Sequence, residues 1–195
     1  MKFKDLSLNS QLLDSIAFMG FDETTPIQEQ AIPEILNGRD LVACAQTGTG
    51  KTAAYVLPVI NHLLENDVKG TNVLIIVPTR ELAIQLGQQI QGIGYMANID
   101  AAVVYGGGSG GDWDKEQQAL KRGSRIIVAT PGKLISHLKM GYVKFEHLTH
   151  LILDEADRML DIGFKDDLFK IISYLPEKRQ TLMFSATMPA KIRPF

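Results

Sequence analysis

The stretch AQTGTGKT at residues 45–52 decides the fold of this chain. It lies between an apolar run at residues 40–45 and a helical pattern at residues 51–65. A glycine-rich loop that ends a strand and opens a helix is the context in which a phosphate-binding loop (P-loop) forms. The sequence therefore predicts a nucleotide-binding α/β domain. A plain glycine turn with an exposed lysine is the alternative that the same letters allow.

Each residue type in this loop suits phosphate binding. Gly48 and Gly50 let backbone N–H groups converge on phosphate oxygens, and the helix N-terminus adds partial positive charge. Lys51 can reach the β- and γ-phosphates, while the Thr52 hydroxyl can ligate Mg²⁺. Ala45 replaces the first glycine of the general motif, so this position must accept a Cβ atom. The nucleotide contacts expected from the loop are Ala45, Gln46, Thr47, Gly48, Thr49, Gly50, Lys51 and Thr52.

Strand-like and helix-like stretches alternate along most of the chain. The apolar runs are continuous rather than alternating in polarity, as expected of parallel strands that are covered on both faces. They lie at residues 40–45, 72–77, 101–105, 125–129, 151–154 and 181–185. Helical patterns lie at residues 51–65, 80–91, 114–121, 131–139 and 165–174. This order predicts a doubly wound, mainly parallel α/β sheet with ligands at the carboxyl ends of its strands.

The residues ahead of the first strand contain two further helical patterns, at residues 10–19 and 27–36, with a turn-rich segment between them. We expect residues 1–39 to form a helical extension that packs on the core. Residues 40–195 are then expected to form a single nucleotide-binding domain, because no linker divides them.

Composition bounds the possible functions of the chain. It has 195 residues, 45% of them hydrophobic and 22% charged, as in ordinary globular proteins. No apolar run approaches the ~20 residues of a membrane span, so no membrane partner is expected. The lone cysteine, Cys44, is predicted to be a buried strand thiol in a reducing, cytoplasmic compartment. The net charge of −2 indicates that any nucleic-acid contact must be local and built from a few placed groups.

A second acidic element completes the phosphate site. The stretch HLILDEAD is an apolar strand that ends in Asp154 and is followed by Glu155. A P-loop needs a carboxylate across the site to hold its metal ion. We expect Thr52 and Asp154 to hold Mg²⁺, Glu155 to orient or deprotonate the attacking water, and Lys51 to complete the catalytic set. An ordinary acidic helix start is the alternative for these letters.

Residues 154–157 spell DEAD, and here the chain strongly resembles the DEAD-box RNA helicases over nearly its whole length. Those enzymes have two RecA-like domains, and this chain is similar to the first. The resemblance implies ATP and Mg²⁺ as cofactors, and RNA and the second RecA-like domain as partners. It also implies a parent enzyme that unwinds RNA locally or remodels RNA–protein complexes. We expect this part alone to be a monomer with little turnover, because arginine fingers worth ~10³–10⁵ in rate belong to the second domain.

The stretch GFDETTPIQ at residues 20–28 resembles the adenine-reading Q motif of that family, with the isolated aromatic Phe3 upstream. The resemblance implies that Gln28 hydrogen-bonds the adenine edge and that Phe21 stacks on its face. An amide suits this task because it donates and accepts at once. Thr24 stands where the family commonly has proline. Core packing of Phe21 and a surface position for Gln28 are the alternatives.

Three loops that follow strands resemble the RNA-contacting motifs of the family. PTRELA is similar to motif Ia, TPGK is similar to motif Ib, and a glycine pair follows the third strand. Such loops would hold the sugar–phosphate backbone of single-stranded or duplex RNA without reading its bases. The RNA contacts expected from them are Pro78, Thr79, Arg80, Gly106, Gly107, Thr130, Pro131, Gly132 and Lys133. Turn and helix-start chemistry is the alternative for all three loops.

Two departures from the family pattern affect these loops. Lys133 stands where the family usually has arginine, which keeps the charge but loses bidentate phosphate geometry. The loop GGGSGGD at residues 106–112 is longer than is usual in the family, and its composition predicts flexibility. Trp113, next to it, is interpreted as loop packing rather than as a stacking platform.

The tripeptide SAT ends the last strand and resembles motif III of the family. The resemblance implies that Ser185, Ala186 and Thr187 couple the ATP site to domain closure through hydrogen bonds with the acidic motif, Asp157 included. Two other functions stay open at this point. A related ATPase could act on DNA, and a protein without enzymatic activity could serve as an ATP-gated RNA clamp.

Overall fold

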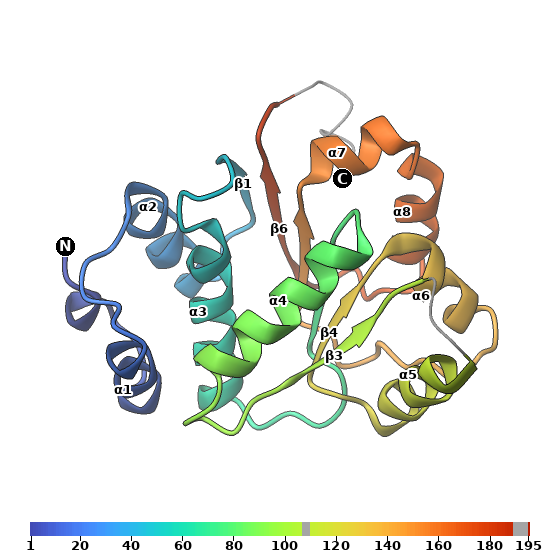
Figure 1. The fold of residues 1–195 in the computed structure, drawn as a ribbon, viewed down its shortest axis with the longest axis horizontal. Helices are drawn as coiled ribbons and strands as arrows, with labels where there is room; N and C mark the ends of the chain where they lie inside the picture. The colour runs from blue at the N-terminus through green and yellow to red at the C-terminus, as the bar shows by residue number, and fades with distance from the viewer. Residues whose placement is uncertain (107–109, 189–194) are drawn as a thin grey trace.

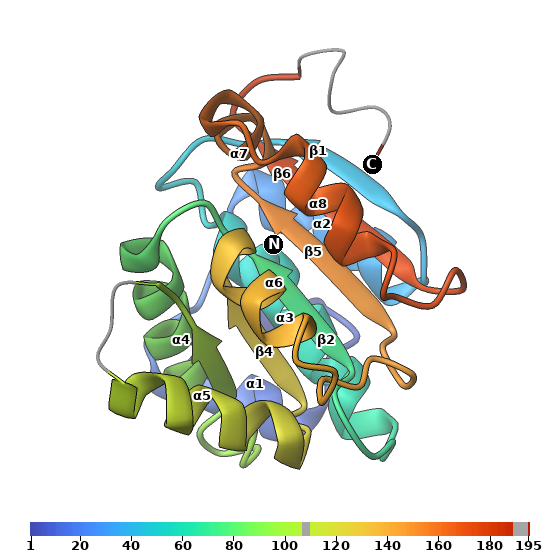
Figure 2. The ribbon, with the colours of Figure 1, turned by 90° about the vertical axis from the view of Figure 1, so that its right-hand side faces the viewer.

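The computed structural model describes residues 1–106, 110–188 and 195. Six strands form one sheet in the order β1–β6–β5–β2–β4–β3, and all neighbouring strands are parallel. Helices lie on both faces of this sheet (Figure 1, Figure 2). The predicted doubly wound parallel α/β sheet is therefore confirmed.

The strands agree with the predicted runs to within one residue at each end. They are β1 (Leu41–Cys44), β2 (Val73–Ile76), β3 (Ala101–Val104), β4 (Ile126–Ala129), β5 (His150–Asp154) and β6 (Gln180–Ser185). In β2, Val73 and Ile75 join the core on one face, while Leu74 and Ile76 join the core on the other. Because helices cover both faces of such a central strand, its residues are apolar at successive positions.

The helices form two layers, one on each side of the sheet (Figure 2). One layer contains α1 (Ser10–Phe18), α2 (Pro26–Leu36), α3 (Lys51–Glu65) and α4 (Arg80–Ile93), and the short 3₁₀ turn η1 (Phe3–Asp5) joins its core. The other contains α5 (Gly110–Arg122), α6 (Pro131–Leu138), α7 (Ala156–Ile162) and α8 (Lys165–Ile172). Since α1 and α2 share a core with α3, the boundary at residue 39 stays a prediction.

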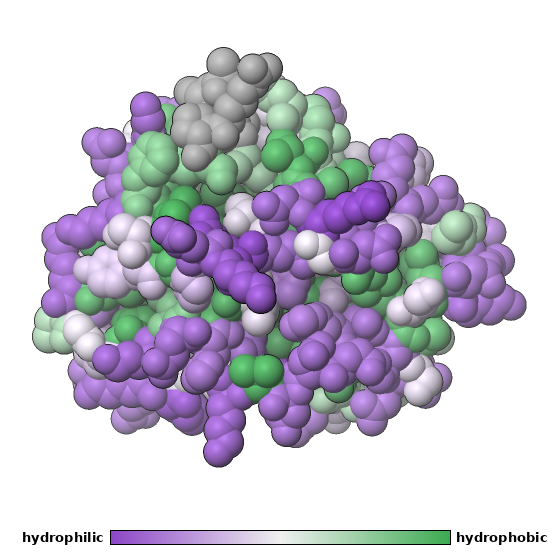
Figure 3. Space-filling view, turned by 180° about the vertical axis from the view of Figure 1, so that it is seen from behind, coloured by the Kyte–Doolittle hydropathy of each residue, from purple (hydrophilic) through white to green (hydrophobic). Residues whose placement is uncertain are grey.

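The surface matches this two-layered core. Hydrophilic side chains cover most of the face shown in Figure 3, and hydrophobic ones gather mainly in its upper part. Within the described part of the chain, none of the helices is long and apolar enough to cross a membrane.

Two helices differ from the sequence prediction. α5 begins at Gly110, so the end of the predicted flexible loop forms its first turn, where Asp112 lies near the positive helix N-terminus. Trp113 therefore lies in a helix and not in a loop, but it does pack within the fold, with its ring stacked on that of His137 at 3.8 Å between centroids. The seven-residue helix α7 is absent from the predicted patterns, because so short a segment shows no clear helical period.

Strand β1 is an exception to two-sided burial. Val42 is 53% exposed and Cys44 is also exposed, whereas Ala43, which faces the other way, is buried. β1 lies at the edge of the sheet, and none of the described helices covers the side that Val42 and Cys44 share. The prediction of a buried Cys44 thiol is therefore wrong. The composition of β1 does not reveal which side of the strand the helices leave exposed.

The helix that follows the P-loop, α3, is held at its far end by Arg125. The Arg125 guanidinium donates hydrogen bonds of 2.9 Å to the carbonyl oxygens of both Leu63 and Asn66, and one of 3.3 Å to Asn72 Oδ1. A cation at this end satisfies carbonyl groups that the helix leaves unpaired and complements the helix dipole. Because Arg125 directly precedes β4, this contact ties the P-loop helix to the sheet.

We expect Arg125→Ala to lower the free energy of unfolding by about 1–3 kcal/mol, because two carbonyl oxygens lose a charged donor. Urea unfolding followed by circular dichroism measures the change. Arg122→Ala removes an exposed arginine from the last turn of α5 and serves as the matched control, with an expected change within about 0.5 kcal/mol. Equal losses in the two variants would contradict the capping role of Arg125.

Candidate functional site

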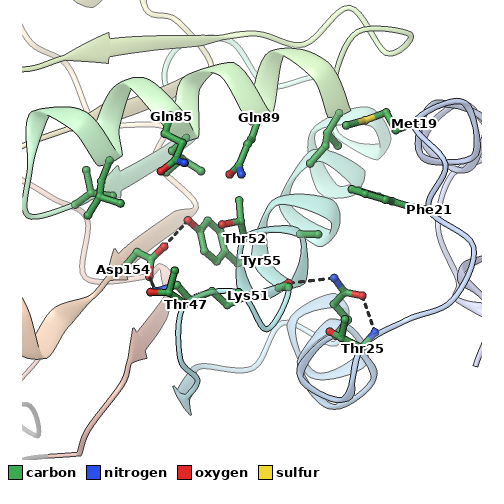
Figure 4. A pocket seen from close by; sticks show the side chains of 18 of the residues that line it. Met19, Phe21, Thr25, Thr47, Lys51, Thr52, Tyr55, Gln85, Gln89 and Asp154 are labelled. Carbon is green, nitrogen blue, oxygen red and sulfur yellow. Dashed lines mark hydrogen bonds and ion pairs between the residues drawn. The ribbon is translucent and has the colours of Figure 1, made fainter.

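A cavity of about 550 Å³ opens at the carboxyl ends of β1 and β5 (Figure 4). Its walls come from the P-loop, from the stretch that precedes and opens α2, from the acidic turn after β5, and from one side of α4. Three of these walls belong to stretches singled out in the sequence. Their meeting at one edge follows from the parallel sheet, because all its strands point their carboxyl ends to that edge.

The P-loop connects β1 to α3 with a conformation that depends on glycine. Gly48 and Gly50 have φ angles of +87° and +82°, a left-handed region that side chains with a Cβ rarely adopt. Ala45 is buried and donates its N–H to a carbonyl oxygen of β6 at 2.9 Å, so a Cβ is accommodated at this position. Thr49 Oγ1 donates to the Gln46 carbonyl at 2.6 Å, which closes the loop on itself.

Lys51 and Asp154 face each other across the cavity. The Lys51 Nζ atom lies 3.0 Å from Asp154 Oδ1, and the two side chains are only 10% and 9% exposed. The hydroxyl of Tyr55, on the same face of α3 as Lys51, donates to Asp154 Oδ2 at 2.7 Å (Figure 4). Burial, and then the negative charge of Asp154, raise the pKa of the Tyr55 hydroxyl well above its usual value. Tyr55 therefore remains a hydrogen-bond donor at physiological pH.

The same carboxylate fits a divalent cation. Asp154 Oδ1 is buried and accepts no well-formed hydrogen bond, although the Lys51 ammonium lies close to it. The Thr52 side chain lines the same cavity. A free carboxylate lone pair beside a hydroxyl oxygen belongs to the hard oxygen ligands that Mg²⁺ prefers.

Glu155 occupies a strained turn directly after β5. Its backbone has φ +54° and ψ +48°, and Asn98 is the other non-glycine residue with a positive φ in the described ranges. A side chain in this region costs about 1–2 kcal/mol, and such strain often marks a functional site. Glu155 lines the cavity next to Asp154, with its side chain 21% exposed. The position fits its predicted role on the attacking water, which stays a prediction.

Gln28 and Phe21 lie in the wall of the cavity opposite the acidic turn. Gln28 Nε2 donates to the Gly50 carbonyl at 3.1 Å, and Gln28 Oε1 accepts from the Thr25 N–H at 2.9 Å. With 5% exposure Gln28 is not a surface amide, yet its amide keeps a second N–H and a second lone pair. Phe21 is 38% exposed and stacks on Phe3 with ring centroids 6.0 Å apart, so it lies at the edge of the cavity rather than in the core.

Hydrogen bonds join the SAT stretch to the acidic motif. Asp157 Oδ2 accepts from the Thr187 N–H at 3.1 Å and from the Thr187 hydroxyl at 3.0 Å, and the Asp157 N–H donates to Ser185 Oγ at 3.2 Å. Burial alone would raise the pKa of Asp157, but these bonds outweigh it and lower the pKa. The Ala186 carbonyl accepts from the Cys44 thiol. The contacts that the resemblance implies are present, while their coupling role stays a prediction.

The loops predicted to bind RNA lie at the other half of the same sheet edge. Residues 78–80, Gly106 and residues 130–133 follow β2, β3 and β4, which are neighbours in the sheet. Arg80 is exposed, with its guanidinium carbon 4.9 Å from the centre of the Tyr105 ring. Gly107 lies outside the described residues.

Several of the predicted RNA contacts are engaged within the fold. The Thr79 hydroxyl accepts from the Leu82 N–H at 3.3 Å and caps α4. Thr130 and Pro131 are buried where they open α6, whereas Gly132 is exposed. Helix-start chemistry, the alternative named for these loops, therefore accounts for part of this set. Arg80 and Gly132 are exposed.

The ammonium of Lys133 is surrounded by groups of α5. Its Nζ lies 3.6 Å from Glu116 Oε1 and 4.9 Å from the centre of the Trp113 ring. Glu116 is buried, accepts from the Tyr105 N–H at 2.7 Å, and lies 3.1 Å from His137 Nε2. Burial lowers the pKa of His137 despite this carboxylate, so the ring is neutral at physiological pH. The charge of Lys133 is therefore partly offset by Glu116.

The sequence profile of the DEAD/DEAH box helicase family matches residues 25–195. The chain belongs to this family. It is 45% identical over 192 residues to the ATP-dependent RNA helicase CshA of Listeria monocytogenes, and the match covers 98% of this chain and 36% of that protein. It is 42% identical over 192 residues to the ATP-dependent RNA helicase DeaD of Escherichia coli, covering 98% of this chain and 30% of that protein.

A solved structure supports the same assignment. The crystal structure of a DEAD box protein from the hyperthermophile Methanococcus jannaschii matches with a TM-score of 0.92 and 37% sequence identity. This match covers 100% of the present chain and 52% of the solved one. The chain therefore spans about a third of the length of the curated relatives above, and has the RecA-like fold of the first DEAD-box domain.

Four residues that contribute to these sites were not predicted from the sequence. Tyr55 lies one helical turn after Lys51, and that spacing places both on one face of α3, which is the signal that could have found it. Gln85 and Gln89 point from α4 into the cavity (Figure 4), but their spacing alone does not say which element they face. Glu116 carries no local signal, because its partners come from separate elements.

Gly50→Ala should destabilise the nucleotide-free domain more than Gly48→Ala does. Both changes place a Cβ at a positive φ, at a cost of about 1–2 kcal/mol. At Gly50 the new atom would also lie 2.6 Å from Gln28 Nε2 and 2.8 Å from Thr25 Oγ1, whereas at Gly48 nothing lies within 4 Å. We expect a further loss of about 1–3 kcal/mol at Gly50, from displacement of a buried amide. Urea unfolding tests this, and equal losses would contradict the importance of the Gln28 contact.

Proposed function

We propose that this chain is the ATP- and RNA-binding first domain of a DEAD-box ATP-dependent RNA helicase. The parent protein would couple ATP hydrolysis to local RNA unwinding or to remodelling of RNA–protein complexes. The observation that carries the proposal is the Lys51 ammonium facing the buried Asp154 carboxylate at 3.0 Å, in a cavity that also contains Gln28. Partners would be RNA and the second RecA-like domain of the same parent chain. The lone cysteine favours a cytoplasmic location.

At the phosphate end of the cavity, nucleotide binding would change the partner of Lys51. When a nucleotide binds, Lys51 moves from Asp154 to the β- and γ-phosphates. Thr52 and Asp154 would hold Mg²⁺, which when bound neutralises charge on the phosphate oxygens. Glu155 would orient the attacking water or accept its proton. Low turnover is expected of this domain alone, because the arginine fingers implied by the family resemblance belong to the second domain.

The base end of the cavity would select adenine. The Gln28 amide has one N–H and one lone pair left after its bonds to Gly50 and Thr25, and adenine offers both an acceptor and a donor along one edge. Phe21 is already supported from behind by Phe3, so its outer face is available for stacking. A base with the opposite pattern would leave a buried polar group unpaired.

We expect the domain to bind ADP about 5–150-fold more tightly than GDP, since an unpaired buried group costs about 1–3 kcal/mol. In Gln28→Ala the ratio of the two affinities should fall towards one. Gln85→Ala changes another amide that lines the cavity and should leave the ratio unchanged. Titration calorimetry measures the affinities of the unmodified chain and of each variant for ADP and for GDP. Equal binding of ADP and GDP by the unmodified chain would overturn the adenine assignment.

RNA binding by this domain would be weak and independent of sequence. Among the predicted contacts, the cationic side chains are Arg80 and Lys133, and Lys133 shares its charge with Glu116. The remaining groups are hydroxyls and backbone N–H groups, which position a phosphate backbone without reading its bases. High affinity would need the second domain to close over the same strand.

The dependence of RNA binding on salt tests this picture. Each neutralised phosphate adds about 0.7 to the slope for single strands, so two cations predict a slope of about 1.5 in magnitude. Fluorescence anisotropy of a labelled oligouridylate across a range of salt concentrations measures the slope. Arg80→Ala should reduce it by about 0.7, whereas Arg39→Ala, which removes a cation paired with Glu34 in another part of the fold, should not. Nanomolar affinity with a steep slope would contradict the proposed surface.

A further inference from the structure

We propose that Tyr55 is a positioning residue of the Mg²⁺ site, whose hydroxyl holds the Asp154 carboxylate in place while Lys51 moves to the phosphates. This inference rests on the proposed function, because it assumes that Asp154 holds Mg²⁺ when nucleotide is bound. It assigns a chemical task to a buried hydroxyl that the P-loop and the acidic motif do not include.

The two oxygens of Asp154 have different partners. Oδ2 accepts a hydrogen bond of 2.7 Å from the neutral Tyr55 hydroxyl, and Oδ1 faces the Lys51 ammonium at 3.0 Å. Oδ1 is also the oxygen that accepts no well-formed hydrogen bond. The carboxylate is therefore fixed on one side by a neutral donor and left open on the other side to a cation.

The Tyr55 ring has no freedom to follow a moving carboxylate. It is wholly buried and packs against Phe184 of β6, with ring centroids 5.1 Å apart. Thr52, the other proposed ligand of Mg²⁺, lies three residues before Tyr55 in α3 and lines the same cavity. One rigid hydroxyl thus holds the carboxylate that would bind the metal ion.

The exchange of Lys51 makes this hydroxyl important. Nucleotide phosphates would attract the Lys51 ammonium away from Asp154, and a buried carboxylate that loses its charged partner is strongly disfavoured. The Tyr55 hydrogen bond does not depend on Lys51, so it persists through the exchange. Donors of this kind orient metal-binding carboxylates in other proteins, and their loss typically weakens metal affinity about 10–100-fold.

A purely structural role for Tyr55 would use its ring and not its hydroxyl. Tyr55→Phe removes the hydroxyl alone and keeps the packing against Phe184. The informative quantity is the gain in ADP affinity that Mg²⁺ produces, measured by calorimetry with Mg²⁺ and again with EDTA. This ratio reports on the metal site separately from the folding of the domain and from the binding of the base.

In the unmodified chain, Mg²⁺ should tighten ADP binding. In Tyr55→Phe we expect this gain to fall about 10–100-fold or to vanish, while affinity in EDTA changes by less than about threefold. Electron paramagnetic resonance of Mn²⁺ added to the ADP complex should show the same loss of metal affinity. Asp154→Asn removes the proposed carboxylate ligand and shows the smallest gain in ADP affinity that Mg²⁺ can produce. Tyr142→Phe, which removes a hydroxyl bonded to His137, is the matched control and should behave as the unmodified chain.

The outcomes separate this inference from the function on which it rests. Failure of the unmodified chain to bind ADP would overturn the proposed function, and the inference with it. ADP binding with a normal Mg²⁺ gain in Tyr55→Phe would overturn the inference alone. Equal losses of affinity in Mg²⁺ and in EDTA, together with a lower melting temperature, would assign Tyr55 a structural role and also overturn it.

Discussion

The buried ion pair between Lys51 and Asp154 is the contact on which the rest of the site depends. It joins the first turn of α3 to the end of β5, although β6 lies between β1 and β5 in the sheet. Two buried charges must pair, because either one alone would be strongly disfavoured in this environment. The ion pair thereby holds the P-loop at the cavity. Nucleotide phosphates and a metal ion can offset the free-energy cost of separating Lys51 from Asp154. The same contact therefore fixes the position of the P-loop and places both groups where a ligand would bind.

Two further attachments surround this pair. Gln28 bonds the carbonyl of Gly50, one residue before Lys51, and Thr187 bonds Asp157, three residues after Asp154. Each attachment joins an element distant in sequence to one side of the ion pair. Nucleotide that displaces Lys51 would therefore disturb contacts to the segment proposed to read the base and to the end of β6. This arrangement gives a physical basis for the coupling that the family resemblance implies.

The opposite half of the sheet edge has a different electrostatic character. Glu116 is buried against Lys133, His137 and the Tyr105 N–H, so it fixes the loops after β3 and β4 to one another. The same carboxylate reduces the charge that Lys133 would present to RNA in the proposed function. Rigid loops with little net charge suit backbone contacts whose affinity is modest in one domain and rises when a second domain closes over the strand.

The local pattern of the sequence was sufficient to predict the six strands, the described helices other than α7, the P-loop and the motif residues that meet at the cavity. These features depend on short-range periodicity and on glycines that permit a left-handed backbone, both of which are visible in neighbouring letters. The exposure of Cys44, the bond from Tyr55 to Asp154 and the pairing of Lys133 with Glu116 were decided by tertiary structure alone. Each depends on which strands and helices become neighbours, and such contacts between distant residues have no local signature.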